Sequence, residues 1–264
     1  MALSREAIEK AADLLAAGRK ADGMLSALPD DCVPQDAADA VAIQDGVNAR
    51  LGHRPAGYKV GFTSPQALEM GGPRGPRPGL LYEHLPAAPP APLPRASIKL
   101  GLIEAEVSYR MGKDLPPREA DYTAEEVLDA VDSAIAGIEV ADSCLADPLT
   151  QPMACLIADN GAAAGFVAGP DIPDWRDRDL KTLEVELLFD GKKVGEGLPR
   201  EARCDETWAL VWTVNHLSAR GIAVRAGDYI TTGAAATPKP LGGAREVIAR
   251  FQGIGDVKVT FNDS

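Results

Sequence analysis

Residues 102–107 read LIEAEV and carry the clearest strand signal in the chain. Because alternate side chains of a strand share one face, Glu104 and Glu106 are expected to point to the same side, with the apolar residues between them on the other. We expect this strand to run over residues 98–109. Two adjacent carboxylates can hold a cation, or they can lie on a solvated strand surface where their repulsion is weak.

Outward from this strand, the pattern predicts a mostly β core with helices at the N-terminal end and in two insertions. Apolar residues at helical spacing predict two helices in the first fifty residues, the second ending at Gly52. A capping box at residues 123–126 begins a helix expected to reach Gly137, and another helix is expected over residues 205–220. Strands are expected at residues 57–62, 138–141, 162–168, 183–189, 229–232, 245–251 and 257–261, with a hairpin turn at 190–191. This arrangement favours an α+β fold over a doubly wound sheet.

Residues 65–94 are rich in proline and glycine, so they are expected to be mostly loop. Loops of this length inside compact chains are more often lids or binding loops than spacers. A plain linker would have the same composition.

The charge of the chain limits its partners. Among its 264 residues, 39 are acidic and 27 are basic, so the overall field repels phosphate backbones and anionic lipid surfaces. With no local basic patch, we expect neither nucleic acid nor a membrane as a partner. A small anionic substrate is still compatible if a metal or a buried cation reverses the field locally.

The cysteines and the hydropathy pattern suggest a compartment. The four cysteines are Cys32, Cys144, Cys155 and Cys204. They form no Cys-x-x-Cys pair, which argues against a zinc site and a disulfide framework. The first residues are charged and amphipathic, and no apolar run reaches membrane-spanning length. We therefore expect a soluble, cytoplasmic protein.

A third glutamate and a lysine lie in apolar strand segments. Glu139 lies in GIEVAD, residues 137–142, where an unpaired charge would be costly to bury. With Glu104 and Glu106 it would suit a hard cation such as magnesium or manganese, whereas the alternative is a salt bridge to an arginine. Lys59 either extends to the surface or lies near the metal, where it would stabilise an enolate oxygen or move a proton.

Other signals are weaker. Asp159 and Asn160 would end a strand with polar groups, although asparagine before glycine is also an ordinary turn signal. The chain has no Gly-x-Ser-x-Gly, Walker, Gly-x-Gly-x-x-Gly or His-Glu-x-x-His motif, so nucleotide binding and serine or zinc hydrolysis lack support. The three histidines share no ligand spacing, and His216 is expected to be structural.

Five segments occur in an order typical of one family. They are GYKVGFTS at 57–64, IEAEV at 103–107, GIEVADS at 137–143, ADN at 158–160 and AGDYITTG at 226–233. Together they resemble the 2-keto-4-pentenoate hydratase and 4-oxalocrotonate decarboxylase group of the fumarylacetoacetate hydrolase superfamily. The resemblance covers nearly the whole chain.

The resemblance implies a mixed β-roll core with N-terminal helices and helical insertions. It suggests an N-terminal helical cap region at residues 1–70 and a β-roll catalytic region at 71–264, joined as one compact unit that forms a homo-oligomer. It places Mg²⁺, or alternatively Mn²⁺, on Glu104, Glu106 and Glu139. The implied catalytic residues are Lys59 and Asn160, and the implied substrate-binding residues are Ser64, Arg77, Leu80 and Asp159.

The implied activity is that of a metal-dependent hydro-lyase of aromatic catabolism. Such an enzyme adds water to a 2-hydroxy-dienoate or 2-oxo-enoate, such as 2-oxopent-4-enoate, through a metal-stabilised dienolate. Three alternatives stay open: a decarboxylase of a 2-oxo-enedioate, a hydrolase of a carbon-carbon bond in a 1,3-diketo acid, and a non-catalytic relative.

Arg77 bears on this choice. Hydratases of the group usually carry Pro-Asp-aromatic-Gly in a mobile loop, and this chain has PRPG at residues 76–79. An arginine cannot act as a base at neutral pH, but it can pair with a second substrate carboxylate. The alternative is that Arg77 faces solvent. Ala234 also replaces the serine that usually follows the late glycine.

Overall fold

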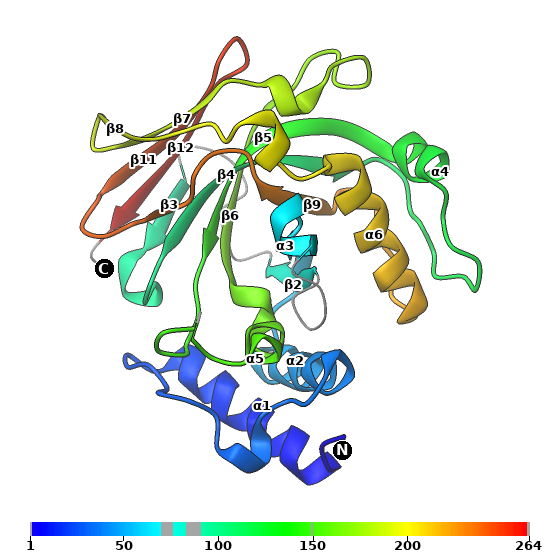
Figure 1. The fold of residues 1–264 in the computed structure, drawn as a ribbon, viewed down its shortest axis with the longest axis vertical. Coiled ribbons are helices and arrows are strands. Elements are labelled where there is room, and N and C mark those ends of the chain that lie inside the picture. Colours follow the sequence, from blue (N-terminus) through cyan, green and yellow to red (C-terminus); the bar gives the residue numbers. More distant parts are fainter. Residues whose placement is uncertain (1, 70–75, 83–90, 149, 263–264) are drawn as a thin grey trace.

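The computed structural model describes residues 2–69, 76–82, 91–148 and 150–262, and two β-sheets form its core (Figure 1). The larger sheet contains β1 (Pro55–Gly61), β2 (Arg77–Tyr82), β4 (Leu102–Met111), β5 (Val131–Ala141), β6 (Ala163–Asp171), β9 (Tyr229–Ala234) and β10 (Lys239–Pro240). Its order is β2-β1-β9-β4-β5-β6, and β10 pairs with β4. The smaller sheet contains β3 (Ala91–Pro94), β7 (Val185–Phe189), β8 (Lys192–Glu196), β11 (Glu246–Phe251) and β12 (Gly255–Asn262). Because β1 runs parallel to β9 while β4 is antiparallel to both of its main neighbours, the larger sheet is mixed, as predicted.

The helices flank these sheets. They are α1 (Arg5–Lys20), α2 (Ala37–Leu51), α3 (Pro65–Glu69), α4 (Ala124–Asp129), α5 (Met153–Ala158) and α6 (Glu206–Ala219). Short 3-10 turns are η1 (Asp30–Cys32), η3 (Arg95–Ser97), η4 (Asn160–Ala162), η5 (Leu180–Thr182) and η6 (Arg200–Ala202). In Figure 1, α1, α2 and α5 form one end of the molecule, and α6 lies beside β9. Within the part of the chain that the structure describes, no helix is long and apolar enough to cross a membrane.

The apolar face of β4 positions the glutamates on its other face. Ile103, Ala105 and Val107 are fully buried in the main hydrophobic core, which also includes Val247 and Val257 of the smaller sheet. Since alternate side chains of a strand point in opposite directions, Glu104 and Glu106 face away from this core. The predicted alternation is therefore confirmed.

The local signals for helix ends are also confirmed. Gly52 ends α2 in the left-handed conformation with φ of 68°, which glycine adopts without steric cost. Asp205 caps α6 by accepting a hydrogen bond from the Trp208 backbone N–H. The hairpin of β7 and β8 turns at residues 190–191, as predicted.

The helix predicted to run from the capping box to Gly137 is wrong beyond its first two turns. The capping box is present, but α4 ends at Asp129 and β5 begins at Val131. Val131 and Ile135 are β-branched and fit a strand well. Pairing with β4 from Leu102 to Met111 then satisfies the backbone of β5, and this long-range partner overrides the local helical spacing.

The expectation of loop over residues 65–94 is wrong for α3, β2 and β3, while residues 70–75 and 83–90 lie outside the described residues. β2 pairs antiparallel with β1 at the edge of the larger sheet, with Gly79 opposite Lys59. An edge strand tolerates Pro78, which has no N–H to donate. The strand predicted before Asp159 is instead helix α5.

The proposed division at residue 70 separates strands that belong together. β1 lies within the range assigned to the helical cap, yet it is a strand of the larger sheet, between β2 and β9. The two-region description stays a prediction.

Candidate metal centre and active site

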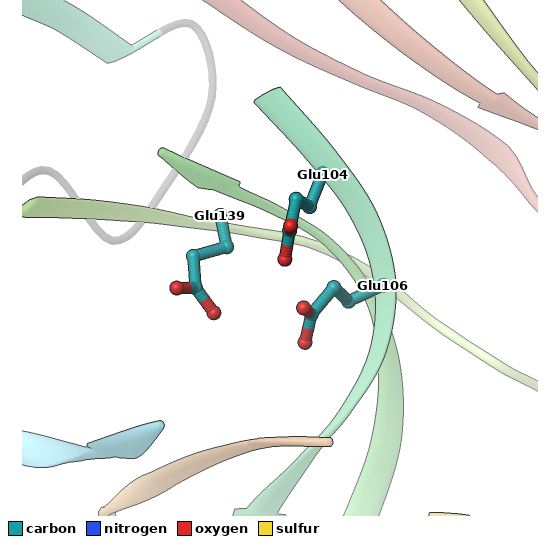
Figure 2. Close-up of side chains that lie close together, drawn as sticks. All are labelled: Glu104, Glu106 and Glu139. Carbon is teal, nitrogen blue, oxygen red and sulfur yellow. The ribbon is translucent and has the colours of Figure 1, made fainter. Parts of the chain in front are cut away.

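Three carboxylates converge beside the larger sheet. Glu104 and Glu106 come from β4 and Glu139 comes from β5, where it lies directly opposite Glu104. Figure 2 shows the three side chains extending from these strands into the same space. One oxygen of each lies within 4.8 Å of the others. Glu106 and Glu139 are each 1% exposed, whereas Glu104 is partly exposed. The alternative that Glu104 and Glu106 share a solvated strand surface is therefore wrong for Glu106.

A bulge in β9 holds Glu106. Glu106 lies opposite Ala234 and Ser108 lies opposite Thr231, so β9 has an extra residue between these pairs. The backbone N–H groups of Thr232 and Gly233 both donate to Oε2 of Glu106, at 3.0 and 2.9 Å. The carboxylate is therefore oriented by the main chain.

Lys59 of β1 contacts Glu139. Its side chain is buried, and its Nζ is 3.0 Å from Oε1 of Glu139, while Thr231 Oγ1 donates to Oε2 at 3.0 Å. The Lys59 ammonium and Oε1 of Glu139 thus form a buried ion pair. The predicted salt-bridge alternative for Glu139 thus exists with a lysine rather than an arginine, and Lys59 does not extend to the surface.

Burial and mutual repulsion set the protonation of these groups. Burial, followed by the charge of Glu139, raises the pKa of Glu104 to about 7. The same two causes raise the pKa of Glu106 well above its usual value, despite the Gly233 hydrogen bond. Burial opposes the charge on Lys59, but Glu139 and Glu104 outweigh it and raise its pKa.

The cluster fits a hard divalent cation. Three carboxylates and one ammonium leave excess negative charge in a buried space once all are ionised, and a cation would compensate it. Oxygen ligands are those that magnesium and manganese prefer. Oε1 of Glu139, whose close partner among the described residues is the Lys59 ammonium, still has a lone pair for a cation.

Asn160 and Asp159 have structural partners. The Asn160 amide donates to the Leu80 carbonyl at 3.0 Å and accepts from the Leu80 N–H at 2.8 Å. The Asp159 carboxylate accepts from Arg19 Nε at 2.5 Å, and also from the Ser143 hydroxyl and the Cys144 N–H. These bonds join η4 to β2 and to α1. The catalytic role of Asn160 and the substrate contacts of Asp159 and Leu80 stay predictions.

Ser64 forms a local hydrogen bond, whereas Arg77 is stacked on an aromatic ring. The Ser64 hydroxyl accepts from the Ala67 N–H at the start of α3, at 3.2 Å, and its substrate contact also stays a prediction. Arg77 is only 1% exposed, so the expectation that it faces solvent is wrong. Its guanidinium carbon lies 3.1 Å from the centroid of the Phe62 ring. Burial lowers the pKa of Arg77 to about 10.

Sequence reasoning missed several residues that shape this site. Thr231, Thr232 and Gly233 position Glu139 and Glu106, and in the sequence they stand out only as part of the segment AGDYITTG. Glycine inside a predicted strand often marks a bulge, and this signal was available at Gly233. Phe62 follows the Lys59 strand directly, but nothing in the sequence pairs it with Arg77.

The chain matches known proteins over most of its length. Residues 84–262 match the family described as Fumarylacetoacetate (FAA) hydrolase C-terminal. A 2-keto-4-pentenoate hydratase of Burkholderia vietnamiensis is 30% identical over 243 residues, covering 90% of this chain and 91% of the relative. A 4-oxalocrotonate decarboxylase of a Pseudomonas species is 26% identical, covering 85% of each chain.

A similar fold is known from a solved structure. The 4-oxalocrotonate decarboxylase of Pseudomonas putida, complexed with magnesium and adipate, has a TM-score of 0.84 and 24% sequence identity, and the match covers 98% of this chain and 99% of that chain. The family match spans β4 and β5, which carry the three glutamates. The resemblance predicted from the five segments is thus confirmed, and the chain belongs to the fumarylacetoacetate hydrolase family.

Proposed function

We propose that this protein is a divalent-metal-dependent hydro-lyase that adds water to a small 2-hydroxy-dienoate or 2-oxo-enoate, such as 2-oxopent-4-enoate. The observation that carries this proposal is the convergence of Lys59 with three glutamates, of which Glu106 and Glu139 are buried. The hydratase relative that covers 90% of the chain supports the reaction type.

Glu104, Glu106 and Glu139 would hold the metal, with magnesium preferred and manganese as an alternative. The similar decarboxylase structure contains magnesium, which supports this assignment. When bound, a divalent cation would supply Lewis acidity that favours negative charge on the 2-oxo oxygen of the substrate.

The chain's own residues then serve the reaction. The Lys59 ammonium lies beside Glu139, where it can stabilise an oxygen that gains charge or transfer a proton to the substrate. Thr232 and Gly233 keep Glu106 in one orientation, and the burial of the site excludes water that would screen these charges. Asn160 acts by holding Leu80 and so positions β2 beside the site.

The second candidate is a decarboxylase of a 2-oxo-enedioate. Arg77 favours it, because it stands where hydratases of the group usually hold an acid and because its side chain is buried beside the Lys59 strand. The 4-oxalocrotonate decarboxylase relative is consistent with this alternative.

One experiment separates these activities. The protein is incubated with magnesium or with a chelator and with three substrates: 2-hydroxypenta-2,4-dienoate, a 2-oxo-enedioate and a 1,3-diketo acid. Products are identified by NMR, with released carbon dioxide measured separately. We expect magnesium-dependent hydration of the first. If carbon dioxide is released from the 2-oxo-enedioate and the other two substrates are unchanged, the protein is a decarboxylase. Cleavage of the 1,3-diketo acid would identify a hydrolase. Failure to bind a divalent metal would support a non-catalytic relative.

We also propose a homo-oligomer in the cytoplasm. All four cysteines are buried and free, which fits a reducing compartment. Met24 and Leu100 are exposed apolar side chains in segments joined by a hydrogen bond from Lys99 Nζ to the Gly23 carbonyl, and they could contact another copy. Light scattering coupled to size-exclusion chromatography tests the oligomer, and a monomer at micromolar concentration would contradict it.

A further inference from the structure

Arg77 and Lys59 lie on the same face of the larger sheet. Arg77 is paired with Gly61 and Gly79 with Lys59 across β1 and β2. Side chains directly opposite in an antiparallel pair share a face, as do alternate residues of one strand. Arg77 therefore faces the side on which Lys59 meets Glu139, as the diagonal neighbour of Lys59 across the two strands.

Gly61 lets the Lys59 ammonium lie over the position that is paired with Arg77. A Cβ built on Gly61, directly opposite Arg77, would lie only 3.2 Å from Lys59 Nζ, which is closer than an ordinary contact. The ammonium therefore lies on the side of Lys59 that is nearer to Arg77, so both cations belong to the same part of the sheet face.

The Arg77 guanidinium is buried, and the described residues leave its donors without a partner. Its Nε, Nη1 and Nη2 form no hydrogen bond with any of these residues. A buried arginine is nearly always paired, because an uncompensated charge in a low-dielectric environment is costly. Its only described electrostatic partner is the Phe62 ring, at 3.1 Å.

The Phe62 ring stacks on the flat face of the Arg77 guanidinium and does not cover the edge that carries its N–H groups. The aromatic ring covers a flat face of the group, whereas all five N–H bonds lie in its plane. Phe62 adopts a φ of 61°, a strained value for a residue other than glycine, and such strain is often retained at functional sites. The ring therefore fixes the plane in which a planar carboxylate can form two parallel hydrogen bonds.

We propose that Arg77, oriented by Phe62, binds a second carboxylate of the substrate, so that within the proposed class of 2-hydroxy-dienoates and 2-oxo-enoates a substrate with a distal acidic group is preferred to 2-oxopent-4-enoate, which has none. This assignment rests on the proposed function in one respect, because it takes the 2-oxo end to lie at the three glutamates. Arg77 contacts the substrate directly, and Phe62 is a positioning residue.

Binding of two unreactive acids of equal length tests the proposal without turnover. Calorimetry with magnesium present compares 2-oxoadipate with 2-oxohexanoate. We expect the wild-type protein to bind the diacid about tenfold or more tightly than the monoacid. Arg77→Met should remove this preference and leave the affinity for 2-oxohexanoate unchanged. Arg178→Met, at an exposed position, is the matched control and should keep the preference.

Two conservative variants test whether the geometry of the guanidinium matters. Arg77→Lys keeps the charge but not the planar pair of donors, so it should retain only part of the preference for the diacid. Phe62→Leu should reduce the preference less than Arg77→Met does. Circular dichroism establishes that each variant is folded.

The outcomes separate this proposal from the proposed function. Equal wild-type affinities, binding of neither acid, or a preference that survives Arg77→Met would each overturn the role of Arg77. By contrast, unchanged magnesium affinity in Glu106→Gln would overturn the metal centre itself, whatever the two acids do.

Discussion

Glu104 and Glu139 face each other as a cross-strand pair on β4 and β5. Like charges directly opposite in a sheet destabilise it, and here Glu106 adds a third carboxylate within the same 4.8 Å cluster. Lys59 compensates only one of these charges. The carboxylates therefore repel one another, and a bound cation would reduce this repulsion. Metal binding should be measurable as an increase in the free energy of unfolding.

Glu106→Gln tests the metal centre. The glutamine oxygen can still accept from the Thr232 and Gly233 N–H groups, so the fold should persist and the metal-free protein should be as stable as the wild type or more so. Magnesium affinity by calorimetry should fall by roughly tenfold or more, and turnover should be abolished. Glu119→Gln, at an exposed position, is the control. Wild-type affinity in Glu106→Gln would refute the site.

Lys59→Met should affect chemistry more than metal binding. The lysine charge is proposed to meet an oxygen that becomes negative only during reaction, so kcat should fall by about 100-fold or more. Magnesium affinity should be retained or increased, because a cation next to Glu139 has been removed. Steady-state kinetics and calorimetry measure the two effects. An unchanged kcat would assign Lys59 a purely structural role.

The raised pKa values of the glutamates predict how stability depends on pH. Glu104, with a folded-state pKa of about 7, binds protons that the unfolded chain has already released above a pKa of about 4.5. Stability of the metal-free protein should therefore fall as pH rises from about 4.5 to 7. Magnesium requires the ionised carboxylates, so the increase in Tm that it causes should be larger at pH 8 than at pH 6. Thermal melts with magnesium or a chelator check both trends, and an increase that is independent of pH would contradict them.

Gly233→Ala should disturb the metal centre through the backbone. Gly233 has a φ of 127°, and a Cβ there would lie 2.3 Å from Thr63 Oγ1. The strain should lower the free energy of unfolding by about 1–3 kcal/mol and weaken magnesium binding, since Gly233 donates to Glu106. Gly243→Ala is the control, because a Cβ at Gly243 meets nothing within 4 Å. Equal stability and equal metal affinity in the two variants would exclude a role for the bulge.

Asn160→Ala distinguishes positioning from direct catalysis. Its amide makes two hydrogen bonds to the Leu80 backbone, and their loss should lower the free energy of unfolding by about 1–3 kcal/mol. If Asn160 acts by holding β2, KM should rise and kcat should change little. A large loss of kcat at unchanged stability would instead indicate direct contact with the substrate or water.

Several features followed from the sequence alone because they depend on neighbours a few residues apart. The shared face of Glu104 and Glu106 follows from the two-residue period of a strand. The ends of α2 at Gly52 and of α6 at Asp205 follow from the chemistry of caps. The helical spacing after Thr123 failed, since the pairing of β5 with β4 outweighs a local pattern.

The tertiary structure alone decided how the site is assembled. The register between β4 and β5 places Glu139 opposite Glu104, and the bulge in β9 aims two N–H groups at Glu106. The pairing of β1 with β2 buries Arg77 on the face of Lys59, although its proline- and glycine-rich surroundings indicated a loop. Strand register and burial depend on contacts between residues far apart in the chain, whereas periodicity and capping report only the local conformation.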